Sequence, residues 1–538
     1  MKLKKVLAGV LATSTVLALA GCSGNTTSST PTNTNTSSSA PASSSAPASS
    51  STPAESSASA ATDSSAPAES SAAADSNAAS GNTEASGGDI EFDESKITDG
   101  LELEICTNRT DLKQNGYLDE LAQPFEDRYN CTITWTAYQN YDDVKTRMST
   151  DDYGDILNIP GGTKPADYER LFEPIGKISE FENRYWWGDG INDTIYGMPT
   201  GGSVSGGFVI NKRVWNEAGY DLSDPAQVPK TPEDLIAALH KIHDNVTYTN
   251  SNGEEVPVQP FQTCYGKAAD WILKEFLQWA PSVAGDPDLQ TNYLVEKKDI
   301  FNHDGPYYKT MKLMFDLYKD AELREADPST SLWEDTKPAL NQGHLACIFV
   351  GSWGVVQFQD GTTTDASVQM DENFESKRED IGFMPLPFTA EDGKQYAESK
   401  ADTRMAINCH IDDSKKELAK AFIKFFINET TYAQDNGFIP TLKGAPMPDY
   451  LEAFGGVQLF TSNRSPEGLN GVWDNISRDS GVGLDQGDTN NFKCRIAEAA
   501  FAGQDVSALD SILAEMDEKW NATRDANEDY LAYMATLG

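Results

Sequence analysis

Positive charge is scarce in this sequence. Its 538 residues include 42 lysines and arginines against 83 aspartates and glutamates, so the formal net charge is −41. Nucleic acid and anionic lipid headgroups repel a chain this acidic, and we exclude both as direct binding partners. The acidity suits a soluble, exposed surface, and it identifies no ligand.

Paired cysteines are also missing. No two cysteines form a C-x-x-C pair, so the sequence gives no support to a zinc ribbon or a thioredoxin-type site. Besides Cys22 there are six cysteines, and four of them lie in apolar, strand-like runs where a free thiol packs as a small hydrophobe. We expect mostly free thiols, and a pairing of Cys106 with Cys131 stays open. The six are Cys106, Cys131, Cys264, Cys347, Cys409 and Cys494.

Metal-binding motifs are lacking among the five histidines. There is no H-E-x-x-H, and His240 with His243 at i, i+3 beside Asp244 is interpreted as a solvated helix face. The segment DDYGD (151–155) lacks the length and register of a calcium loop. Among 83 acidic residues, many carboxylate pairs could be proposed as a glycosidase acid and base, so the pattern alone has no weight. We expect no metal, no cofactor and no catalytic residue.

The apolar stretch at the N-terminus is too short for a membrane span. A lysine-rich start precedes apolar residues 6–19, and the tetrapeptide LAGC follows at 19–22. A secretory signal ends in small residues, and LAGC resembles the bacterial lipobox, in which the signal is cut before a cysteine that carries a diacylglyceryl group. We expect residues 1–21 to be a signal peptide and Cys22 to be lipidated. This predicts a location on the outer face of a membrane, with a Gram-positive-type surface weakly favoured.

Residues 23 to about 89 consist almost entirely of Ser, Thr, Ala, Pro, Asn and Gly, and we take 22–95 as the bounds of this segment. Such a composition cannot bury enough apolar surface to fold, so we expect a disordered tether. About 65 residues of flexible chain have an end-to-end reach of about 45 Å. The folded part can therefore stand off the membrane and still contact a membrane partner.

Strand-like and helix-like segments alternate from about residue 100 onward, which indicates a parallel α/β sheet. LELEICT (101–107) and CTITWTAY (131–138) are predicted strands on either side of the helix GYLDELAQPFEDRYN (116–130). TPEDLIAALHKIHD (231–244) is a predicted helix with Thr231 as N-cap and a proline at the first helical position. At 538 residues the chain should form more than one domain.

The glycine-rich stretch YGMPTGGSVSGGFVINK (196–212) has three interpretations. A phosphate-binding P-loop needs G-K-[ST], but Phe208 follows Gly207. A nucleophile elbow needs G-x-S-x-G, but the run from Gly201 ends on Ser205 and its glycines precede the strand. We favour a crossing between two lobes, because glycine permits positive φ and close backbone approach.

Several segments, taken in order, resemble the extracellular solute-binding proteins of bacterial ABC importers, in particular the carbohydrate-binding group related to maltose-binding protein. They are GDILNIP (154–160), YGMPTGGSVSGGFVINK (196–212), TPEDLIAALHKI (231–242), LACIFVGSWGVVQF (345–358), IGFMPLP (381–387) and AINCHIDDSKKELAKAFIKFFINETTYAQ with GFIPTLKGA (406–445). No single segment decides, but the ordered set behind a lipobox and a tether is specific.

The resemblance implies an α/β, two-lobed periplasmic-binding-protein-like fold of type II, with a ligand cleft between lobes joined by crossover hinges. We expect the solute-binding domain at 96–538. Lobe 1 is expected at about 100–205 and 386–440, and lobe 2 at about 206–385 and 441–538.

The resemblance also suggests aromatic residues for the ligand site. Trp353 occupies the position of a sugar-stacking tryptophan in the family's G-S-W turn, and Trp473 lies in a late region that often holds another. Trp271 is a third candidate, and one of the adjacent Trp186 and Trp187 could reach the cleft. For each tryptophan the alternative is packing in the core.

Polar candidates lie in loops next to strand ends, where open α/β sheets bind ligands. They are Asn108, Arg109, Asp111, Gly161, Gly202, Ser203, Asp402 and Arg404. Arg109 and Asp111 could clamp paired hydroxyl groups.

The expected function is capture of a carbohydrate, such as an oligosaccharide, by a monomer that closes on it and delivers it to an ABC permease and its ATPase. Alternatively, it is a binding protein for another small solute, such as a peptide, an amino-sugar or an organic acid. It could also be a different kind of protein: a surface glycoside-active enzyme, or a sensor or adhesin without transport.

Overall fold

The computed structural model describes residues 88–138, 141–160, 163, 165–186, 189–296, 298–303, 305–363, 368, 370, 373–466, 468–482 and 492–537. The predicted signal peptide, the lipidation site Cys22, most of the tether, Gly161 and Trp187 lie outside these residues.

The fold begins before residue 96, the expected start of the solute-binding domain. Ile90 is fully buried in the core of lobe 1. Asp89 forms ion pairs with Lys424 at 3.0 Å and with Arg184 at 3.4 Å. Ile90 is one apolar residue at the end of a long polar stretch, and its burial needs partners from distant parts of the chain.

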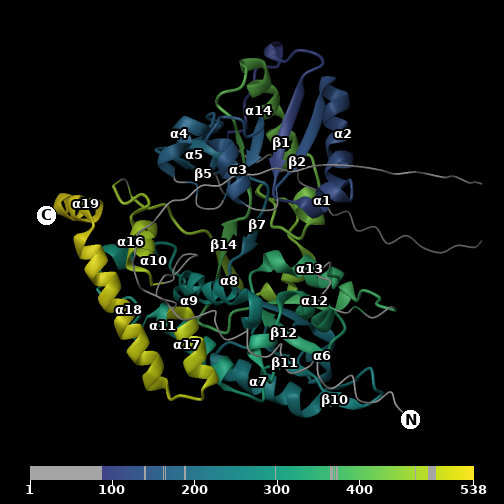
Figure 1. Cartoon of the computed structure of the whole chain (residues 1–538), viewed down its shortest axis with the longest axis vertical. Coiled ribbons are helices and arrows are strands. Elements are labelled where there is room, and N and C mark those ends of the chain that lie inside the picture. The colour runs from purple at the N-terminus through teal and green to yellow at the C-terminus, as the bar shows by residue number, and fades with distance from the viewer. Residues whose placement is uncertain are drawn as a thin grey trace, which may run out of the picture. The chain divides into compact units, whose positions relative to one another are not determined.

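Lobe 1 is built on a seven-stranded sheet (Figure 1). Its main order is β2 (Thr132–Ala137), β1 (Glu102–Thr107), β3 (Ile156–Asn158), β15 (Arg404–Ile407), β6 (Thr194–Pro199) and β4 (Gly176–Lys177), and β5 (Asp189–Ile191) pairs with β6. Strand β1 is parallel to β2 and β3, as expected, whereas β15 is antiparallel to both β3 and β6. The sheet is therefore mixed: its two pairings with β1 are parallel, as expected, but the four pairings that involve β15 or β6 are antiparallel. Strand β15 enters from the other lobe.

Helices cover both faces of this sheet. They are α1 (Thr110–Gln114), α2 (Tyr117–Tyr129), α3 (Tyr141–Met148), α4 (Tyr168–Leu171), α5 (Ile178–Phe181), α14 (Asp413–Asn428) and α15 (Tyr432–Asp435), with short 3-10 turns η1 (Glu94–Lys96) and η2 (Pro165–Asp167). The core under α2 and α14 is aromatic: the rings of Phe125 and Phe422 meet edge to face at 5.1 Å, and Trp135 lies 6.0 Å from Phe422.

Lobe 2 has a four-stranded sheet in the order β11 (Gln259–Phe261), β12 (Leu345–Phe349), β8 (Gly207–Asn211) and β13 (Ile381–Pro385). Strand β8 is antiparallel to both of its neighbours. A small hairpin of β9 (Thr247–Thr249) and β10 (Glu255–Pro257) lies outside it. The surrounding helices are α6 (Lys212–Glu217), α7 (Pro232–Asn245), α8 (Tyr265–Gln278), α9 (Ala280–Ala284), α10 (Leu289–Val295), α11 (Pro306–Lys319), α12 (Trp333–Asn341), α13 (Val355–Asp360), α16 (Val472–Ser480), α17 (Phe492–Phe501), α18 (Val506–Ala526) and α19 (Glu528–Thr536). Four 3-10 helices complete it: η3 (Pro328–Thr330), η4 (Ser352–Gly354), η5 (Arg378–Asp380) and η6 (Asp449–Phe454).

Capping residues fix where the helices of lobe 2 begin. The Thr231 hydroxyl accepts a hydrogen bond from the backbone N–H of Asp234 at 3.1 Å, as predicted for the N-cap of α7. The buried Asn211 side chain accepts from Val214 N at 3.2 Å, which turns β8 directly into α6.

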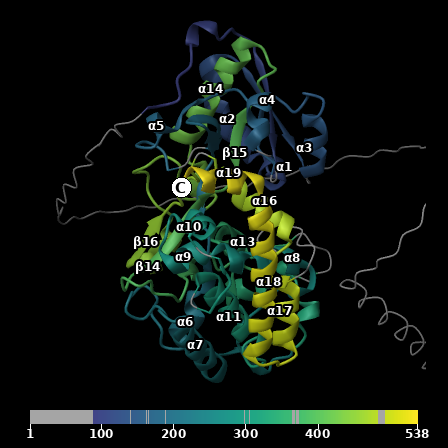
Figure 2. The same ribbon diagram turned by 90° about the vertical axis from the view of Figure 1, so that its left-hand side faces the viewer.

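Three chain crossings join the lobes. The chain leaves β6 and enters β8 through β7 (Gly202–Val204), which pairs with β14 (Gln395–Ala401) in a three-stranded sheet completed by β16 (Val457–Phe460). Gly202 also exchanges backbone hydrogen bonds of 2.8 and 2.7 Å with Ile439, and Thr200 N donates to Thr403 O at 2.9 Å. The crossings at 200–206, 401–403 and 436–442 therefore lie side by side (Figure 2, where β14 and β16 are labelled).

The second crossing occurs later than the expected boundary near residue 386. After β13 the chain stays with lobe 2 and forms β14, which pairs with β16 and returns to lobe 1 only at β15. The proline after β13 ends that strand but does not end the lobe.

All six cysteines of the described chain are free, and Cys106 is not bonded to Cys131. Burial raises the pKa of the Cys106 thiol to about 12, as expected of a cysteine packed as a hydrophobe. None of the helices within the described ranges is long and apolar enough to span a membrane.

Candidate functional site

Polar side chains gather at the carboxyl ends of β1 and β3 in lobe 1. Asn158, the last residue of β3, donates its Nδ2 to Thr107 Oγ1 and to Asn108 Oδ1, both at 3.1 Å. Its backbone oxygen accepts from the Tyr138 hydroxyl at 2.9 Å. The sequence predicted Asn108 at this edge and missed Asn158, although a polar residue at the end of a buried strand was the available signal.

Arg109 is held in place by the segment that leads into the third crossing. Its guanidinium donates to the Tyr432 hydroxyl at 3.3 Å and to Asn436 Oδ1 at 2.9 Å. The sequence predicted Arg109 but not these two partners, which follow α14 and lie within the five residues before Gly437. The side chain of Asp111, Arg109's predicted partner, lies outside what the structure describes.

The second crossing places a charged residue, Asp402, near Arg109. Burial raises the pKa of the Asp402 carboxyl, and the nearby positive charges of Arg109 and Arg404 oppose that rise. The backbone N–H of Asp402 donates to Gly201 O at 3.0 Å, which ties this residue to the first crossing. The structure therefore brings together three of the predicted polar residues, Arg109, Asp402 and Arg404.

Trp353 contributes an aromatic ring from lobe 2. It is half-buried in the turn η4 after β12 and packs against the hydrophobic cores of both lobes. Its ring lies 5.7 Å from that of Trp333. A Cβ on Gly351 would come within 2.7 Å of the indole, so the glycine of the G-S-W turn lets the ring lie against the backbone.

Hydrogen bonds fasten this turn to the crossings. Ser352 Oγ accepts from Val204 N in β7 at 2.9 Å. The Tyr450 hydroxyl contacts Ser352 Oγ at 3.3 Å and donates to Gly437 O. Trp353 thus sits at the junction of the lobes, on a turn bonded to two of the three crossings.

Trp473, the second predicted aromatic, is a core residue. Only 5% of it is exposed, and its ring lies between those of Tyr307, at 6.1 Å, and Trp520, at 4.6 Å. Both faces are covered by residues remote in sequence, so no face is left for a ligand. Trp271 lies in α8, and its side chain is outside the described part.

Gly202 and Ser203 hold the first crossing together and are buried. They pair with Ala401 and Lys400 across β7 and β14, and the backbone N–H and C=O of Gly202 are bonded to Ile439, so this backbone makes contacts within the protein. The glycines of this stretch have negative φ. They serve close packing: a Cβ on Gly206 would collide with the indole of Trp279, whose Nε1 donates to Ser205 O at 2.7 Å.

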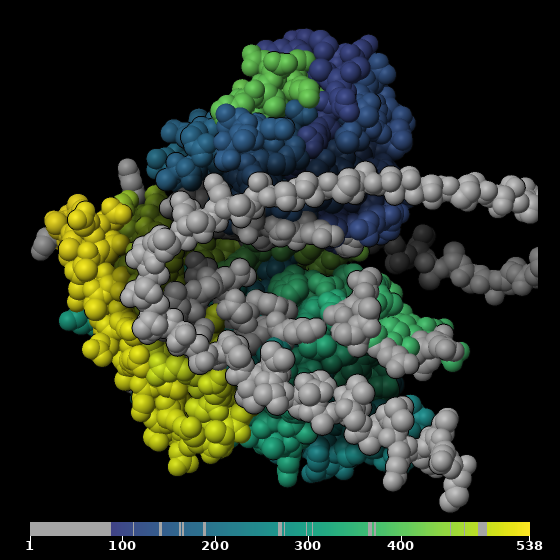
Figure 3. Space-filling model, in the orientation of Figure 1, coloured from purple at the N-terminus to yellow at the C-terminus, as the bar shows by residue number. Residues whose placement is uncertain are grey.

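The surface is hollowed between the purple and blue atoms of lobe 1 and the green atoms of lobe 2 (Figure 3). The residues that face this junction are an aromatic ring from lobe 2, Trp353, and polar groups from lobe 1 and the second crossing, Asn108, Arg109, Asp402 and Arg404. An aromatic plate combined with hydrogen-bonding groups is the combination that binds a sugar ring.

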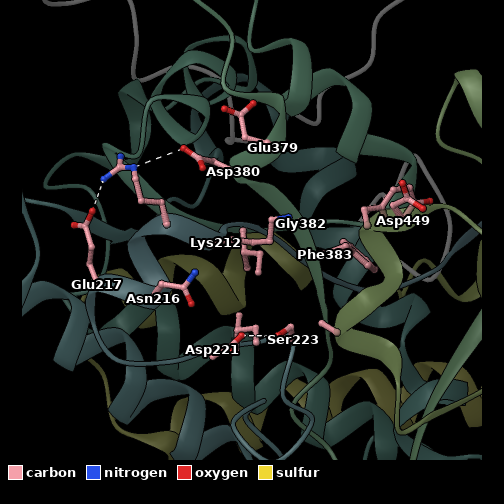
Figure 4. Close-up of a pocket in the computed structure, with 15 residues that line it drawn as sticks. Lys212, Asn216, Glu217, Asp221, Ser223, Glu379, Asp380, Gly382, Phe383 and Asp449 are labelled. Carbon is pink, nitrogen blue, oxygen red and sulfur yellow. Dashed lines mark hydrogen bonds and ion pairs between the residues drawn. The ribbon is translucent and has the colours of Figure 1, made fainter. Parts of the chain in front are cut away.

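A separate cavity of about 650 Å³ lies within lobe 2 (Figure 4). Charged groups dominate it: Arg213 pairs with Glu217 at 2.8 Å and with Asp380 at 3.6 Å. Its two aromatic residues, Phe383 and Tyr450, are buried and present no open ring face. It holds none of the predicted site residues, so we place the functional site at the lobe junction.

One group within the described ranges is close enough to share a cation. His240 Nε2 lies 2.9 Å from Asp320 Oδ2, and Glu322 is on the other side of the ring. All three are at least partly exposed on the surface of lobe 2. The contacts already present are ordinary ion pairs, and His243 is not part of the group.

Comparisons with known proteins identify a family and similar folds. The family model of the bacterial extracellular solute-binding proteins matches residues 110–433. No curated protein matches the chain.

Solved structures of similar fold include sugar complexes. BlMnBP1, a binding protein of an ABC transporter from Bifidobacterium animalis subsp. lactis solved with mannobiose, is 27% identical, with 81% of this chain and 97% of that one covered and a TM-score of 0.67. BlMnBP2 from the same organism, a manno-oligosaccharide-specific solute-binding protein solved with mannotriose, is 25% identical, with 82% and 100% covered and a TM-score of 0.68. RafE from Streptococcus pneumoniae shares the fold at 15% identity, with 79% and 99% covered and a TM-score of 0.55.

Proposed function

Because the chain belongs to the family of bacterial extracellular solute-binding proteins, we propose that it captures an oligosaccharide between its lobes and delivers it to an ABC permease. The observation that carries this proposal is the position of Trp353, half-exposed and in contact with the cores of both lobes. The two relatives at 25% and 27% identity hold mannotriose and mannobiose, which supports a manno-oligosaccharide as the ligand.

The chemistry of the junction suits a neutral sugar. The C–H face of a pyranose stacks on an indole, and its hydroxyl groups need donors and acceptors within the same site. Asn108, Arg109 and Arg404 supply donors, and Asp402 supplies an acceptor. Because an ionised carboxylate is a strong acceptor, Asp402 would hold hydroxyl protons most firmly when charged.

Binding would be coupled to movement of the lobes. The three crossings are short and hydrogen-bonded to one another, so rotation can be confined to them. A sugar that contacts Trp353 from lobe 2 and Arg109 from lobe 1 favours the closed arrangement, because only that arrangement satisfies both contacts. The permease would read the closed form, and its ATPase would supply the energy; no covalent step is needed in this chain.

The proposal also includes a lipid anchor, a location on the outer face of a membrane, and a monomeric state. The L-A-G-C sequence at 19–22 supports lipidation of Cys22, and the polar stretch after it supports a tether. Mass spectrometry of the membrane fraction tests the anchor directly, since a diacylglyceryl group on Cys22 adds a defined mass.

Isothermal titration calorimetry with mannobiose, mannotriose and raffinose tests the ligand. We expect saturable binding of a manno-oligosaccharide at one site per chain and a higher melting temperature with bound sugar. Chromatography of the sugar after incubation is the accompanying control. Shortened products would show a glycoside-active enzyme, and the absence of binding to every sugar would reject a carbohydrate ligand.

A further inference from the structure

Asn158 lies beneath the sugar site and is more than nine-tenths buried. Both protons of its amide are used, one toward Thr107 Oγ1 and one toward Asn108 Oδ1, each at 3.1 Å. Its own Oδ1 is buried and has no donor among the described residues. A buried polar atom without a partner costs free energy, so the fold retains this asparagine for something besides stability.

The direction of these bonds sets the orientation of the neighbouring amide. Asn108 Oδ1 is occupied as an acceptor from Asn158, so the Nδ2 group of Asn108 must point to the other side of the amide plane. Asn158 is inside lobe 1 whereas Asn108 is only half-buried, and that other side faces out of the lobe. The Nδ2 of Asn108 has no acceptor within the described part of the chain.

The same hydrogen bonds also hold the backbone of Arg109, the residue after Asn108. Thr107 Oγ1 accepts from Asn158 and also from the backbone N–H of Arg109 at 3.1 Å. Asn158 therefore contacts both Asn108 and the hydroxyl that holds the start of Arg109.

We infer that Asn158 is a positioning residue that makes Asn108 a hydrogen-bond donor toward the bound sugar. It acts through Asn108 and does not itself touch the ligand, because its Oδ1 is inaccessible to solvent. This role rests on the proposed function, since a sugar hydroxyl or ring oxygen is the acceptor that Asn108 would meet.

The substitution Asn158→Asp tests this role with little change of shape. The new carboxylate can only accept, so Asn108 must turn its Nδ2 inward and present Oδ1 to the ligand. We expect affinity for mannotriose to fall about tenfold, which is the loss of one favourable hydrogen bond. Retained affinity would overturn the inference, because it would mean that Asn108 already presents its oxygen.

A double-mutant cycle separates positioning from general damage. In the background of Asn108→Ala, the substitution Asn158→Asp should change mannotriose affinity by less than about twofold, since the group it orients is gone. Equal losses in both backgrounds would overturn the inference.

Asn408→Asp is the matched control. Asn408 is equally buried, and it donates to Asp151 O at 3.2 Å and to Gly154 O at 3.0 Å at the opposite end of β3. This substitution should lower the melting temperature without changing the affinity for mannotriose.

The same double-mutant cycle can also be measured by urea unfolding, which needs no ligand. Asn158→Asp should shift the unfolding midpoint by different amounts in the wild-type and the Asn108→Ala backgrounds, because only the former has an amide opposite the new carboxylate. Identical shifts would reject the hydrogen bond itself. If the wild type binds no sugar of the panel while this coupling is present, the proposed function fails and the ligand role of Asn158 fails with it, whereas the orientation of Asn108 is upheld.

Discussion

At the residue scale, two tryptophans of lobe 2 occupy similar sequence contexts and different environments. Trp353 and Trp473 each follow a glycine within two residues. Trp353 contacts the core of lobe 1 across the junction, whereas Trp473 is covered by Tyr307 and Trp520. The environment of Trp473 is decided by residues 47 and 166 positions away in the sequence, and that of Trp353 by residues of the other lobe.

This difference gives a paired prediction. Trp353→Ala should weaken mannotriose binding by about 1–3 kcal/mol, because stacking and aromatic burial are lost. Trp473→Ala should leave affinity nearly unchanged and lower the free energy of unfolding by about 3–5 kcal/mol, because it opens a cavity in the core. Calorimetry and urea unfolding of both variants give the two quantities. If Trp353→Ala lowers only the free energy of unfolding and leaves the affinity unchanged, Trp353 is a core residue and not a ligand contact.

The candidate site could be predicted from the sequence only in part. Asn108, Arg109, Asp402 and Arg404 were predicted because polar residues next to strand ends meet at one edge of a sheet, and the structure brings Arg109, Asp402 and Arg404 together. Gly202 and Ser203 were also predicted, but the sequence does not show that β14 would pair with them. Asn158 was missed because it reads as part of a buried strand.

At the scale of single elements, the sequence was most informative where local signals agree. Helix α7 has its N-cap at Thr231, proline at its first position and acids in its first turn, and it begins where predicted. The direction of β15 was not predictable in this way, because a strand's partners depend on the path of the chain through the other lobe.

Helix α18 contains a buried carboxylate that makes stability depend on pH. Burial, with the nearby charge of Asp299, raises the pKa of Asp517 to about 6, although Phe301 N donates to its Oδ1 at 2.9 Å. The folded state therefore holds a proton that the unfolded state releases at lower pH. The stability from this proton is present below the ordinary pKa of aspartate and is lost as pH rises through about 6.

Asp517→Asn removes this dependence. Relative to the variant, the wild type should lose about 2–3 kcal/mol of unfolding free energy between about pH 4 and about pH 7. Urea unfolding at several pH values measures the difference. Asp529→Asn, an exposed aspartate of α19, controls for the loss of one surface charge. If the unfolding free energies of wild type and Asp517→Asn differ by the same amount at every pH, the pKa of Asp517 is not raised.

The first crossing is an element whose glycine has a steric role. Gly206→Ala should lower the free energy of unfolding by about 1–3 kcal/mol, because the added methyl group displaces the fully buried Trp279 and breaks its bond to Ser205 O. Gly456→Ala is the matched control, since a Cβ there meets nothing and its φ is negative. Equal midpoints in urea for the two variants would show that the crossing tolerates the methyl group.

At the scale of the whole molecule, the question is where the tether ends and the fold begins. The Ser-, Ala- and Thr-rich composition ends at about residue 89, but we expected the fold to start at 96, because strand-like and helix-like segments begin only near residue 100. The structure packs residues 88–96 against lobe 1 through the buried Ile90, through Phe92 on the same core, and through Asp89, which also accepts from the Tyr185 hydroxyl at 2.5 Å. Two apolar residues, Ile90 and Phe92, are too few to form a periodic pattern, which is why the boundary was displaced.

Two shortened chains locate this boundary in solution. A chain that begins at Gly88 should match the mature protein in melting temperature and sugar affinity, because residues 22–87 are expected to add no packing. A chain that begins at Ile97 should lose about 2–4 kcal/mol of unfolding free energy, since it lacks the buried Ile90 and the ion pairs of Asp89. Ile90→Ala in the longer chain separates the two contributions and should by itself account for most of the loss. If the chain beginning at Ile97 is as stable as the other, residues 88–96 belong to the tether in solution, and the folded unit starts near residue 96, as predicted from the sequence.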